Sequence, residues 1–190
     1  MGYRGVPGLT LRHQRLKLTW LMAIPFLVFA RPLQDLLLLG GGLAVVGLLL
    51  RGWAAGTIHK DQSLATSGPY ALLRHPLYVG SLLVGAGLAV AGGRWFFLPL
   101  FLALFALVYG RTIRWEEGEM DERFGAAHEE YRRTVPRFVP RIRPYAPASG
   151  PPPQPPGFRF ARFQQNKEWQ AGLGVAVGFG LLCLKAGIFG

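Results

Sequence analysis

The sequence predicts an all-α, polytopic integral membrane protein, and both composition and charge placement support this fold class. Of the 190 residues, 51% are hydrophobic and only 16% are charged, whereas a typical soluble domain has about 25% charged residues. The 21 Lys and Arg, which give a formal net charge of +11, cluster at the flanks of apolar runs, as membrane topology requires. We therefore attribute the positive charge to topology and to attraction for the lipid surface, and we expect no nucleic acid partner.

Four apolar runs predict four core transmembrane helices. The first run is short against the roughly 20 residues needed to cross a bilayer, so a re-entrant segment is the alternative to a tilted span. Four spans place the polar regions 51–76 and 110–145 on one side, which we expect to be cytoplasmic because it carries most of the Lys and Arg. The four runs are residues 16–29, 33–50, 77–91 and 95–109.

A fifth apolar run, residues 169–189, follows a Pro-rich stretch and predicts a C-terminal transmembrane helix. We expect a membrane domain over 1–145 with its core at 51–141, a linker over 146–168 and the added helix over 169–190. That helix could contact a protein partner or a second copy of the chain.

The basic N-terminus precedes an apolar run without a small-residue cleavage site, which predicts an uncleaved membrane segment. The excess of Arg over Lys favours a bacterial inner membrane.

The polar connection before the third run contains Arg74-His75-Pro76. Proline is favoured at the first position of a helix, so a helix beginning here would place a cationic and titratable pair at its N-terminus. Free amides and the helix dipole favour anionic groups at such a position. The segment therefore predicts a ligand site, and the alternative is an ordinary Arg-His loop flanking a membrane span.

A pair of carboxylates, Glu116 and Glu117, follows the fourth apolar run. A carboxylate so close to the lipid boundary is costly unless it faces a polar cavity or a partner.

The single cysteine, Cys183, excludes an internal disulfide and a multi-cysteine zinc site, so we expect no metal.

Several short motifs occur in a distinctive order. They are Ser67-Gly68-Pro69-Tyr70, residues 74–80, Gly85-Ala86-Gly87, Glu116-Glu117, Phe124-Gly125, Tyr131 and residues 135–138. In this order they resemble the isoprenylcysteine carboxyl methyltransferase family, and the phospholipid N-methyltransferases and methanethiol S-methyltransferases share much of the pattern. The resemblance covers about residues 51–141. It implies an integral membrane enzyme that transfers a methyl group from S-adenosylmethionine without a Rossmann domain, and the sequence indeed has no GxGxxG unit.

The resemblance and side-chain chemistry together indicate a cofactor site on the cytoplasmic side. Tyr70 and Tyr78 offer aromatic faces for adenine or the sulfonium, and the Glu116 carboxylate suits the cofactor's ammonium or ribose hydroxyls. Gly85 and Gly87 match a Gly-x-Gly of the phospholipid relatives, although helix packing also explains them. Gln62 stands where relatives often have His. The predicted cofactor-binding residues are Gln62, Leu64, Ala65, Tyr70, His75, Pro76, Leu77, Tyr78, Gly85, Gly87 and Glu116.

The predicted catalytic residues depend on the acceptor. A carboxylate or thiolate needs only alignment and desolvation, whereas an amine needs a base, for which His75 and Glu117 are candidates. The family has an arginine before the glutamate pair that contacts the acceptor carboxylate. Here Thr112 occupies that place, with Arg111 and Arg114 beside it.

The function predicted first is methyl transfer to a lipophilic acceptor, most like that of a protein-S-isoprenylcysteine carboxyl O-methyltransferase. The alternatives are a phospholipid amine or a small thiol as acceptor. A third hypothesis is a non-catalytic membrane subunit or small transporter on the same scaffold. An ion path has little support because no charged residue lies in the middle of an apolar run.

Overall fold

The computed structural model describes residues 23–58, 64–146 and 157–189, and these residues form helices and irregular segments with no β-strand. The predicted all-α class is therefore confirmed. Residues 23–29 are helical. The elements that follow are α2 (Gln34–Thr57), the 3₁₀ helix η1 (Gly68–Ala71), α3 (Pro76–Ala91), α4 (Phe97–Phe124), α5 (Ala126–Thr134), α6 (Phe160–Gln165) and α7 (Trp169–Phe189).

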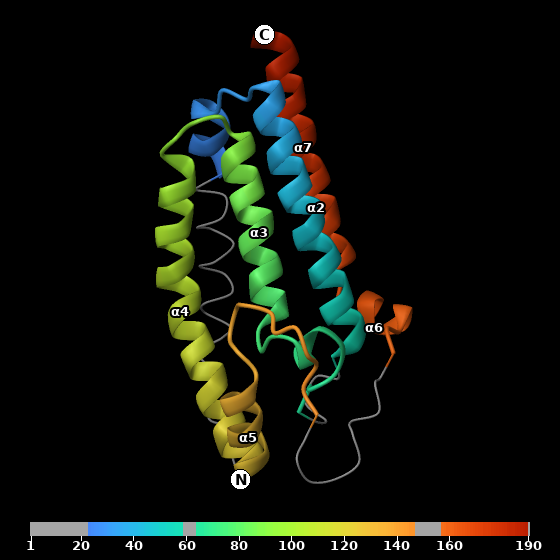
Figure 1. The fold of residues 1–190 in the computed structure, drawn as a ribbon. Helices are drawn as coiled ribbons and strands as arrows, with labels where there is room; N and C mark the ends of the chain where they lie inside the picture. The colour runs from blue at the N-terminus through green and yellow to red at the C-terminus, as the bar shows by residue number, and fades with distance from the viewer. Residues whose placement is uncertain (1–22, 59–63, 147–156, 190) are drawn as a thin grey trace, which may run out of the picture.

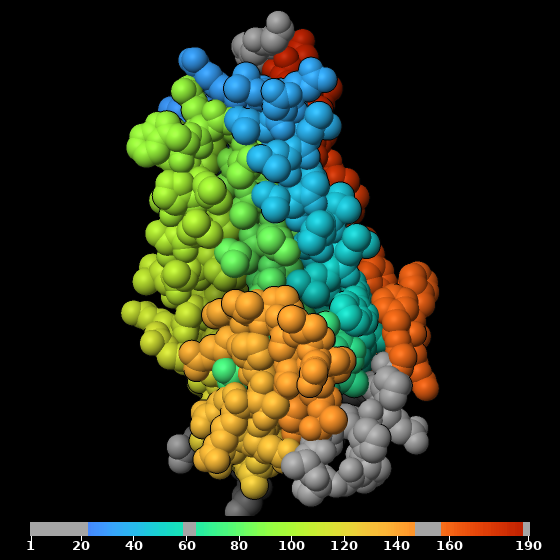
Figure 2. Space-filling view, viewed as in Figure 1, coloured from blue at the N-terminus to red at the C-terminus, as the bar shows by residue number. Residues whose placement is uncertain are grey.

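Helices α2, α3, α4 and α7 run along the length of the molecule; the short helical segment 23–29 lies at one end, and η1, α5 and α6 lie at the other (Figure 1). We call this end the polar end; it holds η1, α5, α6 and the irregular residues 64–75 and 135–146. In Figure 2 residues 126–146 cover the front of the polar end. The long helices thus carry the apolar sequence, and the connections between them build the part that can bind polar ligands.

Glycines bring α2 and α3 into backbone contact. A Cβ atom added to Gly47 would lie 2.6 Å from the carbonyl oxygen of Gly80, and one added to Gly40 would overlap the carbonyl oxygen of Gly87. Small residues allow this close approach between membrane helices. The contact fixes the start of α3, and with it His75 and Pro76, relative to α2.

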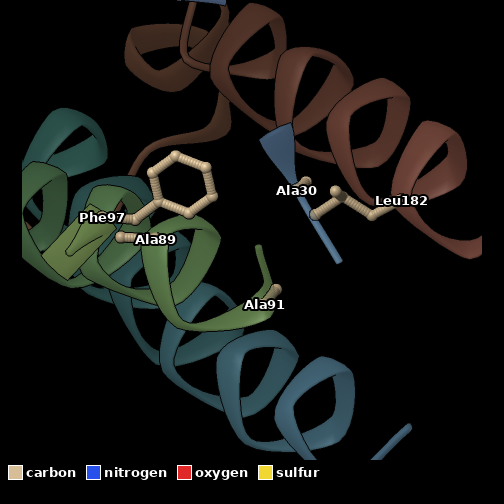
Figure 3. Close-up of a cluster of buried hydrophobic side chains, with 5 residues drawn as sticks. All are labelled: Ala30, Ala89, Ala91, Phe97 and Leu182. Atoms are coloured by element: carbon tan, nitrogen blue, oxygen red, sulfur yellow. The ribbon is translucent and has the colours of Figure 1, made fainter. Parts of the chain in front are cut away.

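The opposite end is closed by an apolar cluster that joins four parts of the chain (Figure 3). Its members are Ala30, Ala89, Ala91, Phe97 and Leu182. On α7, the Lys185 ammonium donates to the carbonyl oxygens of Leu27 and Val28, at 2.5 and 2.8 Å. Because α7 supplies Leu182 and Lys185, it packs as part of the bundle.

Three helices are long and apolar enough to cross a membrane: Gln34–Thr57, Phe97–Phe124 and Trp169–Gly187. Helix α3, Pro76–Ala91, is also apolar but has only 16 residues. The protein is an integral membrane protein by this measure. The count of four core spans and a fifth stays a prediction, and residues 16–22 of the first apolar run lie outside the described residues.

Two predicted boundaries were wrong. Helix α2 continues beyond Leu50 to Thr57, and Arg51, within this helix, bonds to Glu168. Helix α4 continues past Gly110 to Phe124, so the fourth apolar run and the charged segment after it form one helix. Part of the expected linker, 146–168, also forms helix α6.

Candidate functional site

A cavity of about 470 Å³ lies at the polar end, between the start of α3, the charged half of α4 and α5. Its volume falls within the range of about 300–1,000 Å³ typical of small-molecule sites. Nine of the predicted site residues line it. They are Leu64, Ala65, Tyr70, His75, Pro76, Leu77, Tyr78, Glu116 and Glu117.

The start of α3 positions the first group of these residues. Pro76 occupies the first helical position as predicted, and His75 is the N-cap residue. The carbonyl oxygen of His75 accepts hydrogen bonds from the amides of Tyr78 and Val79, at 3.1 and 3.0 Å. The imidazole is therefore held at the helix entrance beside the cavity.

Glu117 is the charge centre of the site and is only 5% exposed. Arg137 donates to both of its carboxylate oxygens, Nε to Oε1 at 3.1 Å and Nη2 to Oε2 at 2.6 Å. His75 Nε2 lies 3.0 Å from Oε1 and donates to it, and Arg74 Nη1 lies 2.8 Å from the same oxygen. One buried carboxylate thus joins three segments of the chain, and its acceptor capacity is used by the protein itself.

Burial determines the protonation state of His75. Removal from solvent lowers the pKa of His75 and outweighs the opposing hydrogen bond to Glu117. The imidazole is therefore neutral at neutral pH. Its Nε2 carries the proton that Glu117 accepts.

Glu116 faces a different partner. The Tyr78 hydroxyl donates to its Oε1 at 2.6 Å, and the Tyr78 ring lies 5.2 Å from that of Tyr109 and 5.8 Å from that of His75, between centroids. A carboxylate beside a group of aromatic faces is suited to a ligand that is both cationic and aromatic.

Two polar groups of the cavity wall are buried without a hydrogen-bond partner among the described residues. They are the Tyr70 hydroxyl and the Nε and Nη1 atoms of Arg74. Arg74 Nη1 is close to Glu117 in distance but lacks hydrogen-bond geometry. Burial raises the pKa of Tyr70, so its hydroxyl remains a neutral donor. Since orphaned buried polar groups are rare in native proteins, these atoms favour a ligand that bonds to them.

The extended segment 135–145 closes one side of the site by bonding to residues 71–75. Amides of Arg74 and His75 donate to the carbonyl oxygens of Pro136 and Arg137, at 2.9 and 3.3 Å. The amides of Arg141 and Tyr145 donate back to Leu72 and Ala71, at 3.0 and 2.9 Å. We call residues 135–145 the strap; these bonds place Arg137 over Glu117.

The C-terminal part of the chain also reaches the cavity wall. Arg51 of α2 donates from Nε and Nη2 to the carboxylate of Glu168, at 3.0 and 2.8 Å. Its Nη1 bonds to the hydroxyl of Ser81. Arg51 lines the cavity, so the residue just before α7 orients a side chain of the site.

Other predicted residues lie away from the cavity. Gly87 contacts the backbone of α2, and Gly85 faces the ring of Phe101 on α4, which supports the packing explanation for both. Arg111 and Arg114 are exposed on α4 and do not line the cavity. Gln62 lies outside the described residues.

Sequence reasoning missed several lining residues. Arg74 and Tyr131 stood within recognised motifs and could have been chosen, whereas Arg51 and His128 gave no signal in the sequence. The missed lining residues are Arg51, Ile58, Arg74, Ser81, Tyr109, Met120, Arg123, Phe124, His128 and Tyr131. Among the described residues no group of three or more His, Cys, Asp or Glu is placed to hold a metal ion.

The fold and the site together define a helical membrane protein with a charged and aromatic small-molecule cavity at its polar end. Residues 38–127 match the family model described as phospholipid methyltransferase. The matched segment contains α3 and the charged half of α4, and so it includes His75, Tyr78, Glu116 and Glu117. The predicted resemblance to membrane methyltransferases is therefore confirmed.

Two curated relatives are named as methyltransferases, in agreement with this family match. A protein-S-isoprenylcysteine O-methyltransferase of Schizosaccharomyces pombe is 34% identical over 84 residues, 44% of this chain and 36% of the relative. Methanethiol S-methyltransferase 2 of Bradyrhizobium diazoefficiens is 38% identical over 88 residues, 46% of this chain and 32% of the relative. These names are consistent with the methyltransferase class predicted from the sequence.

A third relative has a different kind of name. The cobalt-zinc-cadmium resistance protein CzcN of Cupriavidus metallidurans is 37% identical over 135 residues, 70% of this chain and 57% of the relative. The chain thus spans little more than half the length of this relative and less of the other two. No solved structure matches the chain significantly.

Proposed function

We propose that this protein is an integral membrane methyltransferase that uses S-adenosylmethionine to methylate a lipophilic or small-molecule acceptor. The observation that carries the proposal is the cavity at the polar end, where the carboxylate, aromatic and orphaned polar groups described above meet. The methyltransferase family match covers most of its wall residues. We place this end at the cytoplasmic face of a bacterial inner membrane, where a water-soluble donor is available.

The residues present fit S-adenosylmethionine, which supplies an electrophilic methyl group when it is bound. Glu116 would pair with its ammonium or accept from its ribose hydroxyls. Tyr78 offers an aromatic face for its cationic and adenine parts. The Tyr70 hydroxyl and Arg74 Nε, which lack a hydrogen-bond partner among the described residues, match the oxygen atoms of such a ligand.

The chain's own residues contribute orientation and desolvation. The Glu117 contacts hold His75, Arg74 and the strap in one arrangement before any ligand binds, which reduces the cost of ordering the site. The aromatic and apolar wall limits water around the reacting atoms. Methyl transfer needs little more than this when the acceptor is already an anion.

The alternative is a non-catalytic membrane subunit on the same scaffold. The relative named for cobalt-zinc-cadmium resistance favours it, because that relative matches the largest share of this chain of those compared above. Under this alternative the cavity would not bind S-adenosylmethionine with useful affinity.

Calorimetry of S-adenosylmethionine binding to the purified protein tests the proposal. We expect micromolar binding by the wild type and loss of binding in Glu116→Ala and His75→Ala, with Glu119→Ala on the exposed side of α4 as the matched control. Folding of each variant is checked by thermal unfolding in detergent. Well-folded wild-type protein that does not bind the donor would contradict the proposed function and favour the non-catalytic alternative.

A further inference from the structure

The cavity has a second histidine–carboxylate pair, formed by His128 of α5 and Asp121 of α4. His128 Nδ1 lies 2.7 Å from Asp121 Oδ1, and Arg132 Nη1 donates to Asp121 Oδ2 at 3.0 Å. His128 lines the cavity and is only 3% exposed. An aspartate paired with an arginine is an ionised acceptor, so the proton of the imidazole is on Nδ1.

This tautomer leaves a lone pair on Nε2 of His128. Within the described part of the chain, the side-chain hydrogen bond of His128 is the one between Nδ1 and Asp121. An imidazole that is oriented through Nδ1 by a carboxylate and keeps Nε2 unprotonated is the usual arrangement of a histidine general base. The pair therefore has the chemical features needed to accept a proton from a group in the cavity.

A glycine makes the pair possible. Gly125, between α4 and α5, has φ of +50°, a backbone conformation that glycine adopts at little cost. The turn ends α4 and starts α5 within one residue, so His128 returns to Asp121 of the preceding turn.

The first pair, His75 with Glu117, is less suited to this role. His75 Nε2 already donates to Glu117, and Arg74 and Arg137 occupy the rest of that carboxylate. A proton placed on Glu117 would weaken its contacts with two arginines. The neutral His75 also keeps a lone pair, on Nδ1, but a proton taken up there would add a third cation beside Arg74 and Arg137. Asp121 has one arginine beside it, so a proton on His128 meets less repulsion.

The cavity wall offers limited recognition of an acceptor carboxylate. Arg51 is paired with Glu168, and Arg74 and Arg137 are grouped around Glu117. At the position where the family's acceptor-binding arginine was expected, the Thr112 hydroxyl donates to the carbonyl oxygen of Val108 at 3.0 Å. Arg123 lines the wall as well and lies over the ring of Phe124, 6.0 Å from its centroid.

We propose that His128, oriented by Asp121, is the general base that removes a proton from a thiol or amine acceptor. The inference rests on the proposed function. In the step, the S–H or N–H bond of the acceptor breaks and its proton goes to Nε2. The freed electron pair forms the new bond to the methyl carbon, and the pair of the breaking carbon–sulfur bond returns to the sulfonium sulfur of the donor, which becomes a neutral thioether.

Other charged groups share the cavity and enter the interpretation of any pH profile. Asp121 bonds to His128 and Arg132 bonds to Asp121, and the Tyr131 ring is tilted against that of His128 with centroids 6.3 Å apart. Burial raises the pKa of Tyr131, so its hydroxyl stays protonated over the useful range. The remaining charged groups on the wall are Arg51, Arg74, Arg123, Glu116 and Glu117.

The test measures transfer of a labelled methyl group by the full chain in detergent between pH 6 and 10. The acceptors are an alkanethiol, phosphatidylethanolamine and a prenylcysteine carboxylate. We expect transfer to the thiol or the amine, and a rate about 100-fold lower at pH 7 in His128→Asn, which keeps an N–H for Asp121 but has no basic nitrogen. We expect recovery near the acceptor's own pKa, where solvent removes the proton. Donor affinity, measured by calorimetry, should change less than about twofold.

Other outcomes of this test would overturn either the role of His128 as general base or the proposed function. A rate loss in His128→Asn that is the same at every pH would show a structural role for His128 and overturn the inference. Transfer only to the carboxylate, abolished by Arg123→Gln and kept in His128→Asn, would overturn it too, as would donor binding without transfer to thiol or amine. Absence of donor binding to the wild type would overturn the proposed function itself and this inference with it.

Discussion

The two histidine–carboxylate pairs of the cavity join the same two chemical groups and differ in how many partners within the protein the carboxylate has. The side chain of Glu117 is 6% exposed and has His75, Arg74 and Arg137 around it, whereas that of Asp121 is 37% exposed and has His128 and Arg132. The Glu117 group joins segments far apart in the sequence, and the Asp121 group joins neighbouring helices. We infer that the first pair mainly stabilises the site and the second retains capacity for chemistry.

The largest expected effect is that of Glu117→Gln. Removing one member of a buried ionic group leaves the others without compensation and costs about 3–5 kcal/mol. We expect a fall of about 3 kcal/mol in the free energy of unfolding, together with loss of donor binding, measured by denaturant titration and calorimetry. Glu119→Gln on the same helix, where the side chain is exposed, should leave both unchanged. A fall below 1 kcal/mol in Glu117→Gln would break the comparison.

A smaller loss of stability is expected for Asp121→Asn. The carboxylate is more than a third exposed, and partners in contact with solvent contribute about 1 kcal/mol or less. Stability should fall by no more than this, while methyl transfer to a thiol or amine at pH 7 slows by at least about tenfold because His128 loses its orientation. Denaturant titration and initial rates on the same preparation give both values. A stability loss equal to that of Glu117→Gln would remove the distinction between the pairs.

The pH dependence of stability sharpens the comparison at His75. Burial lowers the pKa of His75 below its ordinary value of 6.5 in the folded state. Between the lowered value and 6.5 the unfolded chain binds more protons, so the free energy of unfolding rises with pH in this window. We expect stability to fall from pH 7 to pH 5, with a smaller slope in His75→Gln. Equal slopes in the two proteins would contradict the assignment of a neutral, buried His75.

The smallest expected effect is that of Glu129→Gln on the outer face of α5. Glu129 pairs with Arg133 at i,i+4, and the two side chains are 49% and 77% exposed. Such pairs contribute about 0.3–0.5 kcal/mol. Thermal unfolding should shift by about one degree or less, and methyl transfer should not change. A large effect would mean that solvent exposure does not determine how much a carboxylate contributes to the free energy of unfolding in this protein.

Much of the fold could be predicted from local sequence. Composition gave the membrane class, Pro76 marked the start of α3, and the apolar run 169–189 gave the bounds of α7. The ends of α2 and α4 could not be predicted in the same way. Arg51 ends an apolar run in the sequence, but its partner Glu168 is 117 positions away, and no local pattern shows that pairing.

Part of the cavity wall was predictable from the motif residues. His75, Tyr78 and Glu116 line the cavity as expected, although donor binding by them remains to be measured. Arg111 and Arg114 were chosen by proximity in sequence to the glutamate pair, yet on a helix neighbours in sequence point in different directions. The pair of Asp121 and His128 depends on the turn at Gly125, which a reading of residue types alone does not reveal.

The strap has a consequence for how this sequence can change over generations. Its attachment to residues 71–75 uses peptide groups, which nearly every amino acid possesses, while Val135 and Tyr145 at its two ends are buried beside Ala71 and Tyr131. Val139 and Ile142 are 73% and 98% exposed and are not constrained by that attachment. Mutation can therefore alter the outer surface at these positions, for a new membrane or a new neighbour, while Arg137 keeps its place over Glu117.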